Sequence, residues 1–249
     1  MSSLLAHLRR VLALLLVSIL ALQLFFVVRI AGMRWVDPQS TTFQRSEARR
    51  ILGERGELPW RQEWVSAERI SEHLKRAVIA SEDASFAEHG GIDWESLEKA
   101  WQRNQRAEDR AEQRNARAPA QAQPVQAKVV GGSTITQQLA KNLLLSGERT
   151  VMRKAQEFVL TLALEALLGK ARILEIYLNS VEWGEGVFGA QAAAQHYFRT
   201  DAARLTPAQA ARLAVMLPAP KRFEKRPSSA YLGGRTATVL ARMPSVLLP

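Results

Sequence analysis

The longest apolar run in the chain lies close to its N-terminus. From Val11 to Val28 there is no charged side chain, and only Ser18 and Gln23 interrupt the apolar residues. At a rise of about 1.5 Å per residue, this run makes roughly 27 Å of helix, close to the thickness of the hydrocarbon core of a bilayer. We therefore expect one transmembrane signal-anchor helix over residues 11–30. A cleaved signal peptide is the alternative, but its apolar core is usually shorter and ends in a small-x-small cleavage site.

Beyond this run, apolar positions recur three and four residues apart, the spacing of amphipathic helices. Thr134 with Gln137, and Thr206 with Pro207, are typical helix starts, because they supply a side-chain partner or a fixed φ to the first turn. Strand-like alternation between turns is nearly absent, so we expect a mainly α fold. The expected helices run from Ser66 to Ser81, from Trp94 after the N-cap Asp93, from Thr134 to Leu145, from Thr150 to Gly169, from Ala171 to Leu178, and from Thr206 to Pro218.

One segment differs in composition from the rest of the chain. In residues 104–127, Gln, Ala and Arg dominate, and Val125 is the only large apolar side chain. Such a segment buries too little apolar surface to offset its ordering entropy, so we expect a mobile insertion, helical up to Pro119. The expected organisation is a short N-terminus (1–10), the span (11–30), a membrane-proximal segment (31–65), a helical domain with the insertion (66–226) and a C-terminal segment (227–249).

The composition excludes several classes of protein. With 47% apolar residues, a chain of 249 residues can bury a large core, which excludes a disordered or fibrous protein. The absence of cysteine excludes a disulfide scaffold, a Cys-ligated zinc site and a thiol nucleophile. The four histidines lack the paired spacing of metal ligands, so no zinc site is expected. The net charge of +10 favours an anionic partner, but cannot choose among nucleic acid, a lipid surface and a phosphorylated substrate.

Three further patterns carry less weight. Gly184, Gly186 and Gly189 have the spacing of a dinucleotide-binding loop, but the preceding segment is predicted as helix rather than strand. Ser96 and Lys99 match the S-x-x-K of penicillin-binding transpeptidases, yet no K-T-G or S-D-N follows. The basic stretches belong to no recognised nucleic-acid-binding module. We therefore expect no dinucleotide, no transpeptidation and no nucleic acid.

Two carboxylates are candidate catalytic groups. Glu82 follows directly on an apolar helix and precedes a glycine turn, a position that can hold an acid in a partly desolvated cleft and raise its pKa. An ordinary surface carboxylate at a helix end is the alternative. Glu157 follows Arg153 and Lys154 on one helix, and these cations favour its ionised form. Two carboxylates in different electrostatic settings are typical of enzymes that make or break glycosidic bonds.

A glycine turn between these acids leads into a helix. The run Gly131–Gln138 brings free backbone N–H groups together with the positive end of the helix dipole, which favours an anion. Gln137 and Lys141 lie four residues apart on one helical face, and Arg149 and Arg153 follow nearby. A phosphate-bearing substrate would explain this grouping. A solvated polar helix face is the alternative for any one of these residues.

Taken in order, these segments resemble the successive motifs of the peptidoglycan glycosyltransferases, the family that includes the glycosyltransferase domain of class A penicillin-binding proteins. The resemblance covers about residues 40–225, and order and spacing follow the family except across the insertion. Since no transpeptidase domain follows, a monofunctional transglycosylase is expected. The matching motifs are Glu82–Gly91 (EDASFAEHGG), Gly131–Gln138 (GGSTITQQ) with Lys141 and Asn142, Arg153–Glu157 (RKAQE), Ile173–Asn179 (ILEIYLN), and Gly184, Gly186 and Gly189 with Tyr197 and Phe198.

The resemblance implies a mainly helical, two-lobed, lysozyme-like domain, held against the outer face of the cell inner membrane by an N-terminal helix whose start is cytoplasmic. It also implies the reaction: an inverting transfer that polymerises lipid II into β-1,4-linked glycan strands in cell wall biogenesis and releases undecaprenyl diphosphate. The implied partners are lipid II, the growing glycan chain, membrane lipid and division or elongation proteins. No cofactor is implied as required, and a divalent cation, Mg²⁺ or Mn²⁺, at the diphosphate with Asp83 as a contact stays open.

Residue roles follow from the same resemblance. Glu82 is implied as the general base that deprotonates the acceptor hydroxyl, and Glu157 as the group that orients cations or stabilises positive charge at the sugar. Gln156 stands at a position that is often basic in the family. The side chains implied in binding substrate and diphosphate are Ser133, Gln137, Lys141, Arg149, Arg153 and Lys154. Those implied in supporting the site are Asp83, Phe86, His89, Gly132, Thr134, Asn142, Glu175 and Asn179.

Two other functions compete with this assignment. A lytic enzyme that cleaves finished glycan could use a similar fold and a lone acid, but it has no use for a group of diphosphate-binding cations. A non-catalytic membrane scaffold of the wall machinery is the other alternative, and it predicts that a substitution of Glu82 has no effect.

Overall fold

A computed structural model describes residues 2–117, 119, 123–127, 131–145, 147–148 and 150–249. The fold is mainly helical, as the apolar spacing predicts, and the strands are short. The helices are α1 (Ser2–Gly32), α2 (Thr42–Arg55), α3 (Glu72–Glu82), α4 (Trp94–Arg117), α5 (Ile135–Leu144), α6 (Val151–Leu168), α7 (Lys170–Ser180), α8 (Ala190–Phe198), α9 (Pro207–Met216), α10 (Pro220–Glu224) and α11 (Ala230–Arg242). The strands are β1 (Arg61–Gln62), β2 (Glu182–Gly184) and β3 (Val187–Phe188).

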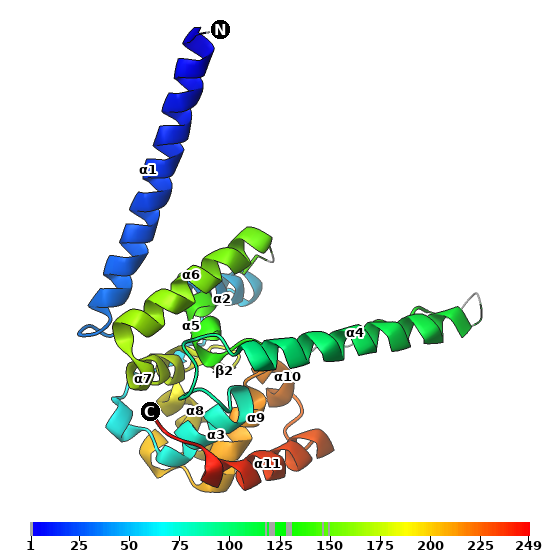
Figure 1. Cartoon of the computed structure of the whole chain (residues 1–249). Coiled ribbons are helices and arrows are strands. Elements are labelled where there is room, and N and C mark those ends of the chain that lie inside the picture. The colour runs from blue at the N-terminus through cyan, green and yellow to red at the C-terminus, as the bar shows by residue number, and fades with distance from the viewer. Residues whose placement is uncertain (1, 118, 120–122, 128–130, 146, 149) are drawn as a thin grey trace.

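Helix α1 leaves the domain as a separate rod (Figure 1). Its stretch Leu4–Gly32 is long and apolar enough to cross a membrane, and it extends further at both ends than the expected span of 11–30. The side chains from Leu4 to Leu22 are exposed, whereas Ile30 and Met33 are buried against the domain. The helix is therefore exposed over its first two thirds and packs against the domain with one face of its last third.

Hydrogen-bonded caps start most of the domain helices where the sequence predicts them. Thr134 with Gln137 and Thr206 with Gln209 form complete capping boxes at α5 and α9. Thr150 caps α6, which ends before Gly169 as expected. One start is wrong, because Ser66 opens only a 3-10 turn at Ala67–Arg69, and α3 begins after Ser71, whose hydroxyl accepts from Leu74 N. Ser66 and Ser71 lie five residues apart and could each cap a helix, and the helix begins after Ser71.

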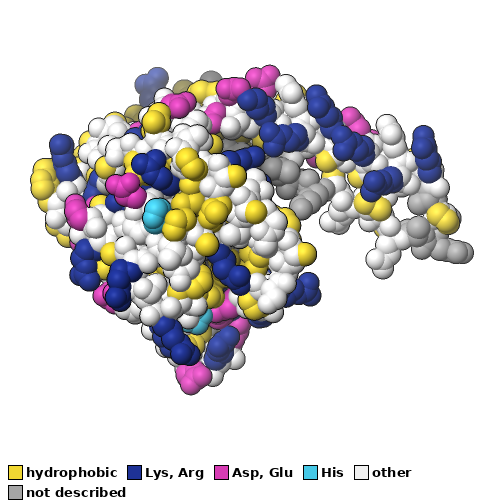
Figure 2. Space-filling model, turned by 90° about the horizontal axis from the view of Figure 1, so that it is seen from below, with side chains coloured by type: hydrophobic (Ala, Val, Ile, Leu, Met, Phe, Trp, Pro, Cys, Tyr) yellow, Lys and Arg dark blue, Asp and Glu magenta, His cyan; other side chains and the backbone are white. Residues whose placement is uncertain are grey.

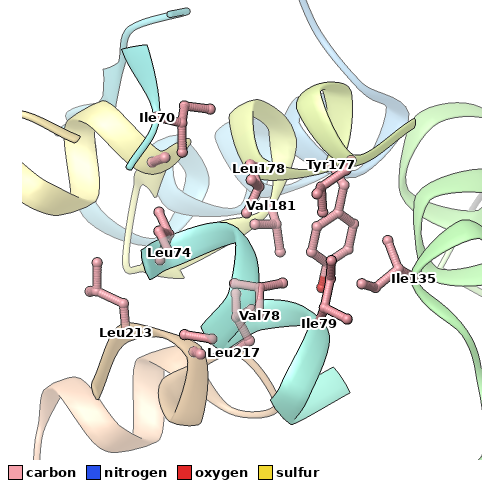
Figure 3. Close-up of a cluster of buried hydrophobic side chains, with 14 of the residues drawn as sticks. Ile70, Leu74, Val78, Ile79, Ile135, Tyr177, Leu178, Val181, Leu213 and Leu217 are labelled. Atoms are coloured by element: carbon pink, nitrogen blue, oxygen red, sulfur yellow. The ribbon is translucent and has the colours of Figure 1, made fainter. Parts of the chain in front are cut away.

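The domain consists of two helical halves. Helices α3, α9 and α11 pack together in one half, and α2, α5 and α6 pack in the other, with α1 against α6. Helices α7 and α8 and the small sheet connect the halves. Figure 3 shows the core at their junction, where Leu74 and Val78 of α3 meet Leu213 of α9 and Tyr177 and Leu178 of α7. These side chains are at most 1% exposed. Full burial of a large aliphatic side chain such as that of Leu74 stabilises the fold by about 1.5–3 kcal/mol.

The glycines with dinucleotide-like spacing belong to the sheet, whose strand order is β1-β3-β2. Gly186 lies in the β2–β3 turn with φ of 73°, and Gly189 precedes α8 with φ of 84°. A Cβ at Gly186 would lie 2.1 Å from the carbonyl oxygen of Pro59. These glycines therefore permit a tight turn and a close backbone approach, and they do not open a phosphate-binding loop.

The predicted insertion begins inside a long helix. Helix α4 continues to Arg117 and projects sideways from the domain as an arm (Figure 1). Asp93 accepts from Ser96 N at 2.8 Å and caps the start of this helix, as predicted. Asn115 exchanges two hydrogen bonds with the backbone of Val125, which returns along the arm. Figure 2, which looks from the side opposite to α1, shows dark blue Lys and Arg side chains along this arm.

Candidate active site

A cleft of about 1110 Å³ lies between the two halves of the domain. Its walls come from α2, the end of α3, the segment around α5, the start of α6, β2 and the residues after α9. Of the predicted site residues, it is lined by Glu82, Ser133, Gln137, Lys141, Asn142, Arg153, Lys154 and Glu157. The tertiary structure thus brings residues that lie up to about 75 positions apart in sequence into one hollow. Arg149, which was also predicted, lies outside the described residues.

Glu82 is the last residue of α3 and faces the cleft from a half-buried position. Burial raises the pKa of Glu82 above its usual range, and hydrogen bonds from Gln138 and Ser81 oppose this effect by stabilising the carboxylate. The donor distances are 3.1 Å from Gln138 Nε2 and 3.4 Å from Ser81 Oγ. A carboxylate that is partly desolvated but held by neutral donors is suited to accept a proton near neutral pH.

Gln138 and Tyr177 belong to the candidate site, although they were not among the residues selected from the sequence. The Tyr177 hydroxyl donates to Gln138 Oε1 at 2.9 Å, and this directs the amide N–H of Gln138 at Glu82. Burial raises the pKa of Tyr177 well above 10, and the charges of Glu82 and Asp83 raise it further, so Tyr177 stays a neutral donor. Both residues lie within motifs quoted above, but only their side-chain contacts reveal this chain of hydrogen bonds.

Asp83 supports the site from behind the cleft. Its Oδ2 accepts from Ile135 N at 2.9 Å, at the first residue of α5, and its Oδ1 pairs with His89 Nε2 at 2.9 Å. The residue is 7% exposed, and both carboxylate oxygens are engaged by protein nitrogens. Asp83 therefore ties α3 to the glycine turn, and a contact from this residue to a divalent cation stays a prediction. Among the described residues, no group of three His, Asp or Glu side chains could hold a metal ion.

The remaining support residues around Asp83 fix the glycine turns. Phe86 is fully buried, with its ring edge-on to His89 and the Lys170 ammonium 4.3 Å from its centroid. Thr134 Oγ1 donates to the carbonyl of Gly91 at 2.7 Å. A Cβ on Gly132 would come within 3.1 Å of the Ala100 side chain, so glycine lets the turn pack against α4. These contacts explain why the turn beside Glu82 and the turn before α5 sit together.

A cluster of opposite charges forms the other wall, near the start of α6. Glu157 is 3% exposed and accepts from Arg153 Nη1 at 2.7 Å and from Lys154 Nζ. Lys141 of α5 lines the same cleft. Because Glu157 uses both oxygens on these cations, its place is to hold them in position. Their remaining N–H groups can meet an anion in the cleft, since each cation has more donors than the carboxylate uses.

The other predicted residues divide between the cleft and its supports. Gln137 lines the cleft, but its Oε1 accepts from Thr134 N at 3.1 Å, so only the rest of its amide is open for substrate. Glu175 and Asn179 do not line it. Asn179 instead holds Val65 through both backbone groups, at 3.0 and 2.9 Å, and Glu175 accepts from Ala67 N at 3.1 Å. These two residues fix the segment between β1 and α3.

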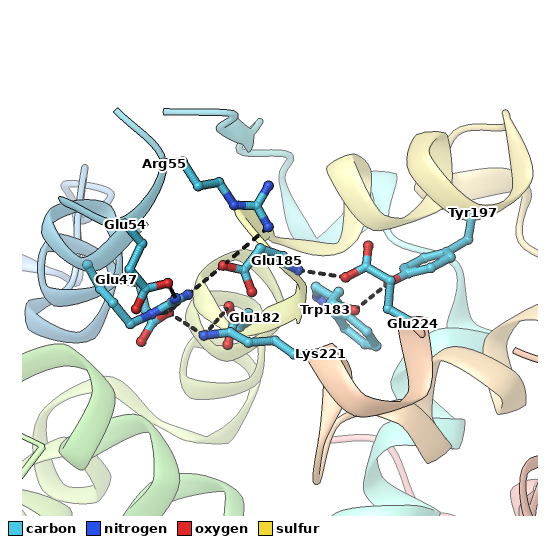
Figure 4. Close-up of polar contacts among 10 residues, drawn as sticks. Glu47, Glu54, Arg55, Glu182, Trp183, Glu185, Tyr197, Lys221 and Glu224 are labelled. Atoms are coloured by element: carbon cyan, nitrogen blue, oxygen red, sulfur yellow. Dashed lines mark hydrogen bonds and ion pairs between the residues drawn. The ribbon is translucent and has the colours of Figure 1, made fainter. Parts of the chain in front are cut away.

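A network of ion pairs at one end of the cleft was not predicted. Glu182 of β2 is 7% exposed, and burial raises its pKa to about 7. Lys221 bridges it to Glu47 of α2, with 3.4 Å from Nζ to Glu182 Oε1 (Figure 4). Arg50 continues the network by pairing with Glu47 and with Glu185. The network joins α2, β2 and α10 at this end of the cleft.

Comparison with known proteins agrees with the geometry. The sequence model of the protein family described as Transglycosylase matches residues 50–244. The chain is 50% identical over 234 residues to the biosynthetic peptidoglycan transglycosylase of Herminiimonas arsenicoxydans, covering 93% of this chain and 92% of that protein. It is 47% identical to proteins of the same name from Paraburkholderia phytofirmans, over 231 residues, and Bordetella pertussis, over 227 residues. These alignments cover 92% and 91% of this chain and 88% of each relative.

Proposed function

This chain belongs to the transglycosylase family and is a peptidoglycan glycosyltransferase of cell wall synthesis, and from that premise we propose how its cleft carries out the transfer. The domain has the lysozyme-like fold of the family, and its substrates are lipid II and the growing glycan chain. The observation that carries the proposal is that Glu82 and the cation cluster of Arg153 and Lys154 line one cleft. One group can take up a proton there while the other neutralises a leaving diphosphate.

Glu82 acts as the general base. It accepts the proton of the 4-hydroxyl of the GlcNAc of lipid II while that oxygen attacks C1 of the MurNAc at the reducing end of the growing chain. The new C1–O bond forms on the face opposite to the departing phosphate, so the anomeric configuration inverts. The raised pKa of Glu82 makes its carboxylate a stronger base, and the hydrogen bond from the amide of Gln138 stabilises the ionised form.

The cations bind the diphosphate and stabilise the charge that develops on it as the C1–O bond breaks. Arg153 and Lys154 are held in advance by Glu157, so little reorganisation is needed when the leaving group departs. Lys141, which lines the same cleft, also binds the diphosphate, and Arg149 is assigned to this role from its motif in the sequence. Ser133 and the free part of the Gln137 amide donate hydrogen bonds to the sugars or phosphates.

The protein is anchored in the inner membrane by α1, with its N-terminus in the cytoplasm and the catalytic domain on the outer face. A lipid-linked substrate supports this placement, because the lipid keeps the diphosphate at the bilayer surface. The length and exposure of the apolar helix support it as well. Division or elongation proteins are its partners in the wall machinery.

The decisive experiment compares Glu82→Gln with the wild-type full-length chain on labelled lipid II. We expect polymerisation to fall by at least about a hundredfold, the usual effect of removing a general base. Glu88→Gln is the matched control, because Glu88 is an exposed acid of the same segment and does not line the cleft. A retained rate in Glu82→Gln would overturn the assignment. Release of fragments from finished glycan by the wild type would favour the lytic alternative.

A further inference from the structure

The apolar helix α1 and the catalytic helix α6 are joined by a reciprocal pair of amides. Gln23 Nε2 donates to Gln156 Oε1 at 2.9 Å, and Gln156 Nε2 donates to Gln23 Oε1 at 3.0 Å. Gln23 is one of two polar residues that interrupt the apolar run, and Gln156 stands where the family is often basic. The two exceptions to the sequence pattern therefore contact each other across 133 positions of the chain.

Burial along α1 begins at this pair. Every side chain from Leu4 to Leu22 is exposed, and Gln23 is the first that is partly buried. Phe26 and Ile30 follow three and seven residues later on the same helical face, Met33 follows directly after the helix, and all three pack against the domain. One face of the last third of α1 is thus docked on the catalytic domain, and Gln23 marks the point where the helix leaves the domain.

The position of the charges on α1 places this pair in the apolar layer of the membrane. Arg10 and Arg29 bound the uncharged stretch, and Gln23 lies six residues before Arg29, which corresponds to about 9 Å along the helix. An amide at that depth without a partner costs several kcal/mol, because no water is present to bond it. In the reciprocal pair, each amide both donates and accepts, so the cost of burying both is largely removed.

The surroundings of Gln156 on α6 agree with this depth. Val151, Met152, Val159 and Leu162 of the same helix are 86%, 79%, 50% and 53% exposed, which suits contact with lipid chains rather than with water. Gln156 also lies next to Glu157 in the sequence and two and three residues after Lys154 and Arg153. A contact that fixes Gln156 against the span therefore also fixes the height of these two cations relative to the bilayer.

We propose that the Gln23–Gln156 amide pair clamps the catalytic domain to its membrane span, and that both residues are positioning residues that hold Arg153 and Lys154 level with the diphosphate of membrane-bound substrate. The proposal rests on the proposed function, because it requires α1 to cross the bilayer and the cations to bind the diphosphate. It makes α1 part of the substrate-binding architecture as well as an anchor.

The first test measures catalysis on membrane-bound substrate. The full-length chain is placed in bilayers of phosphatidylethanolamine and phosphatidylglycerol that contain lipid II, as wild type, Gln23→Leu, Gln156→Leu and the double variant. Each single variant leaves one amide unpaired, and we expect the KM for lipid II to rise about threefold to thirtyfold with a smaller change in kcat. The double variant recovers part of the loss, because no unpaired amide remains.

Two controls separate positioning from general damage. Ser18→Leu removes the other polar residue of the run, whose side chain is exposed, and leaves KM unchanged. A water-soluble lipid II analogue with a short prenyl chain, assayed in detergent, is used equally well by Gln23→Leu and wild type, because the clamp acts only through the bilayer. The clamp proposal would be overturned if Gln23→Leu had the wild-type KM in bilayers, or if it lost as much activity on the soluble analogue as in bilayers.

The second test detects the contact itself. The chain contains no cysteine, so Gln23→Cys with Gln156→Cys introduces the only two thiols. A short bifunctional thiol reagent joins them in bilayers, whereas the control pair Ser18→Cys with Gln156→Cys reacts at least about tenfold more slowly. Equal reaction of the two pairs contradicts the docked arrangement. Failure of the clamp is distinguished from failure of the proposed function by Glu82→Gln in the same bilayers, which loses polymerisation whether or not the clamp exists.

Discussion

Tyr177 and Gln138 form a 2.9 Å hydrogen bond that fixes which end of the Gln138 amide faces Glu82. The Tyr177 hydroxyl occupies the amide oxygen, so the amide N–H is turned to the carboxylate, 3.1 Å from Oε2. A fully buried tyrosine of the core thereby controls the electrostatic environment of the proposed general base. The pKa of Glu82 depends on two opposing effects, burial that raises it and this amide that lowers it.

The first prediction concerns the pH dependence of Gln138→Leu. Removal of the amide donor leaves the effect of burial less opposed, so the pKa of Glu82 rises further. Since the base acts in its ionised form, kcat/KM falls as the pH falls through this pKa, and the variant loses activity at a higher pH than wild type. A pH profile of lipid II polymerisation measures the shift. Tyr177→Phe moves the profile in the same direction by a smaller amount. If the loss of activity at low pH occurs at the wild-type pH in both variants, the hydrogen bonds from Tyr177 through Gln138 do not control the pKa of Glu82.

The second prediction concerns Glu157→Gln. This variant breaks a buried contact to Arg153 and Lys154, and the released cations lose their fixed geometry. We expect at least about a tenfold loss of kcat/KM, since preorganised charge is what such a cluster contributes. We also expect a loss of stability that is smaller than the roughly 3–5 kcal/mol of a fully buried pair, because Arg153 and Lys154 are 16% and 40% exposed. Thermal unfolding and lipid II turnover test both effects, with Glu88→Gln as control. A wild-type rate of turnover in Glu157→Gln would contradict the role of Glu157 in holding the cations.

The third prediction concerns Glu182 and the stability of the fold. Burial raises the pKa of Glu182 from 4.5 to about 7, so the folded protein binds more protons than the unfolded chain between these values. The protonation of Glu182 therefore contributes its full share to the stability of the fold below pH 4.5, and this contribution is lost as the pH rises through 7. Glu182→Gln removes this dependence, and its stability relative to wild type increases from pH 5 to pH 8 by up to about 3 kcal/mol. Melting temperatures at the two pH values measure it, and a pH-independent difference would contradict the shift.

The fourth prediction concerns the turn between β2 and β3. Gly186→Ala places a Cβ 2.1 Å from the Pro59 oxygen at a φ of 73°, so the turn or β1 must move. We expect a loss of stability of more than about 2 kcal/mol, because both the contact and the backbone conformation exclude a side chain. Gly53→Ala is the matched control. Gly53 lies inside α2 with open space around it, and alanine there stabilises a helix by about 0.5–1 kcal/mol. Equal melting temperatures of the two variants would contradict this account.

The sequence by itself determined the local elements and located the candidate reactive groups in short motifs. Capping residues such as Thr134 and Thr206 act within one turn of their own position, so their boxes can be predicted without knowledge of the fold. The apolar run of α1 and the carboxylate at the end of α3 are local in the same sense. The wrong start at Ser66 shows the limit, because two nearby serines offer similar caps and packing selects Ser71.

Only the tertiary structure decided which distant residues meet. Gln138 lies in a motif that the sequence reveals, but the sequence does not reveal its contacts with Tyr177 and Glu82, which span 39 and 56 positions of the chain. The same holds for Glu182 with Lys221, and for Gln23 with Gln156. The physical reason is that helical periodicity and capping are short-range effects, whereas the pKa of a carboxylate and the pairing of a buried amide depend on groups that packing brings from elsewhere in the chain.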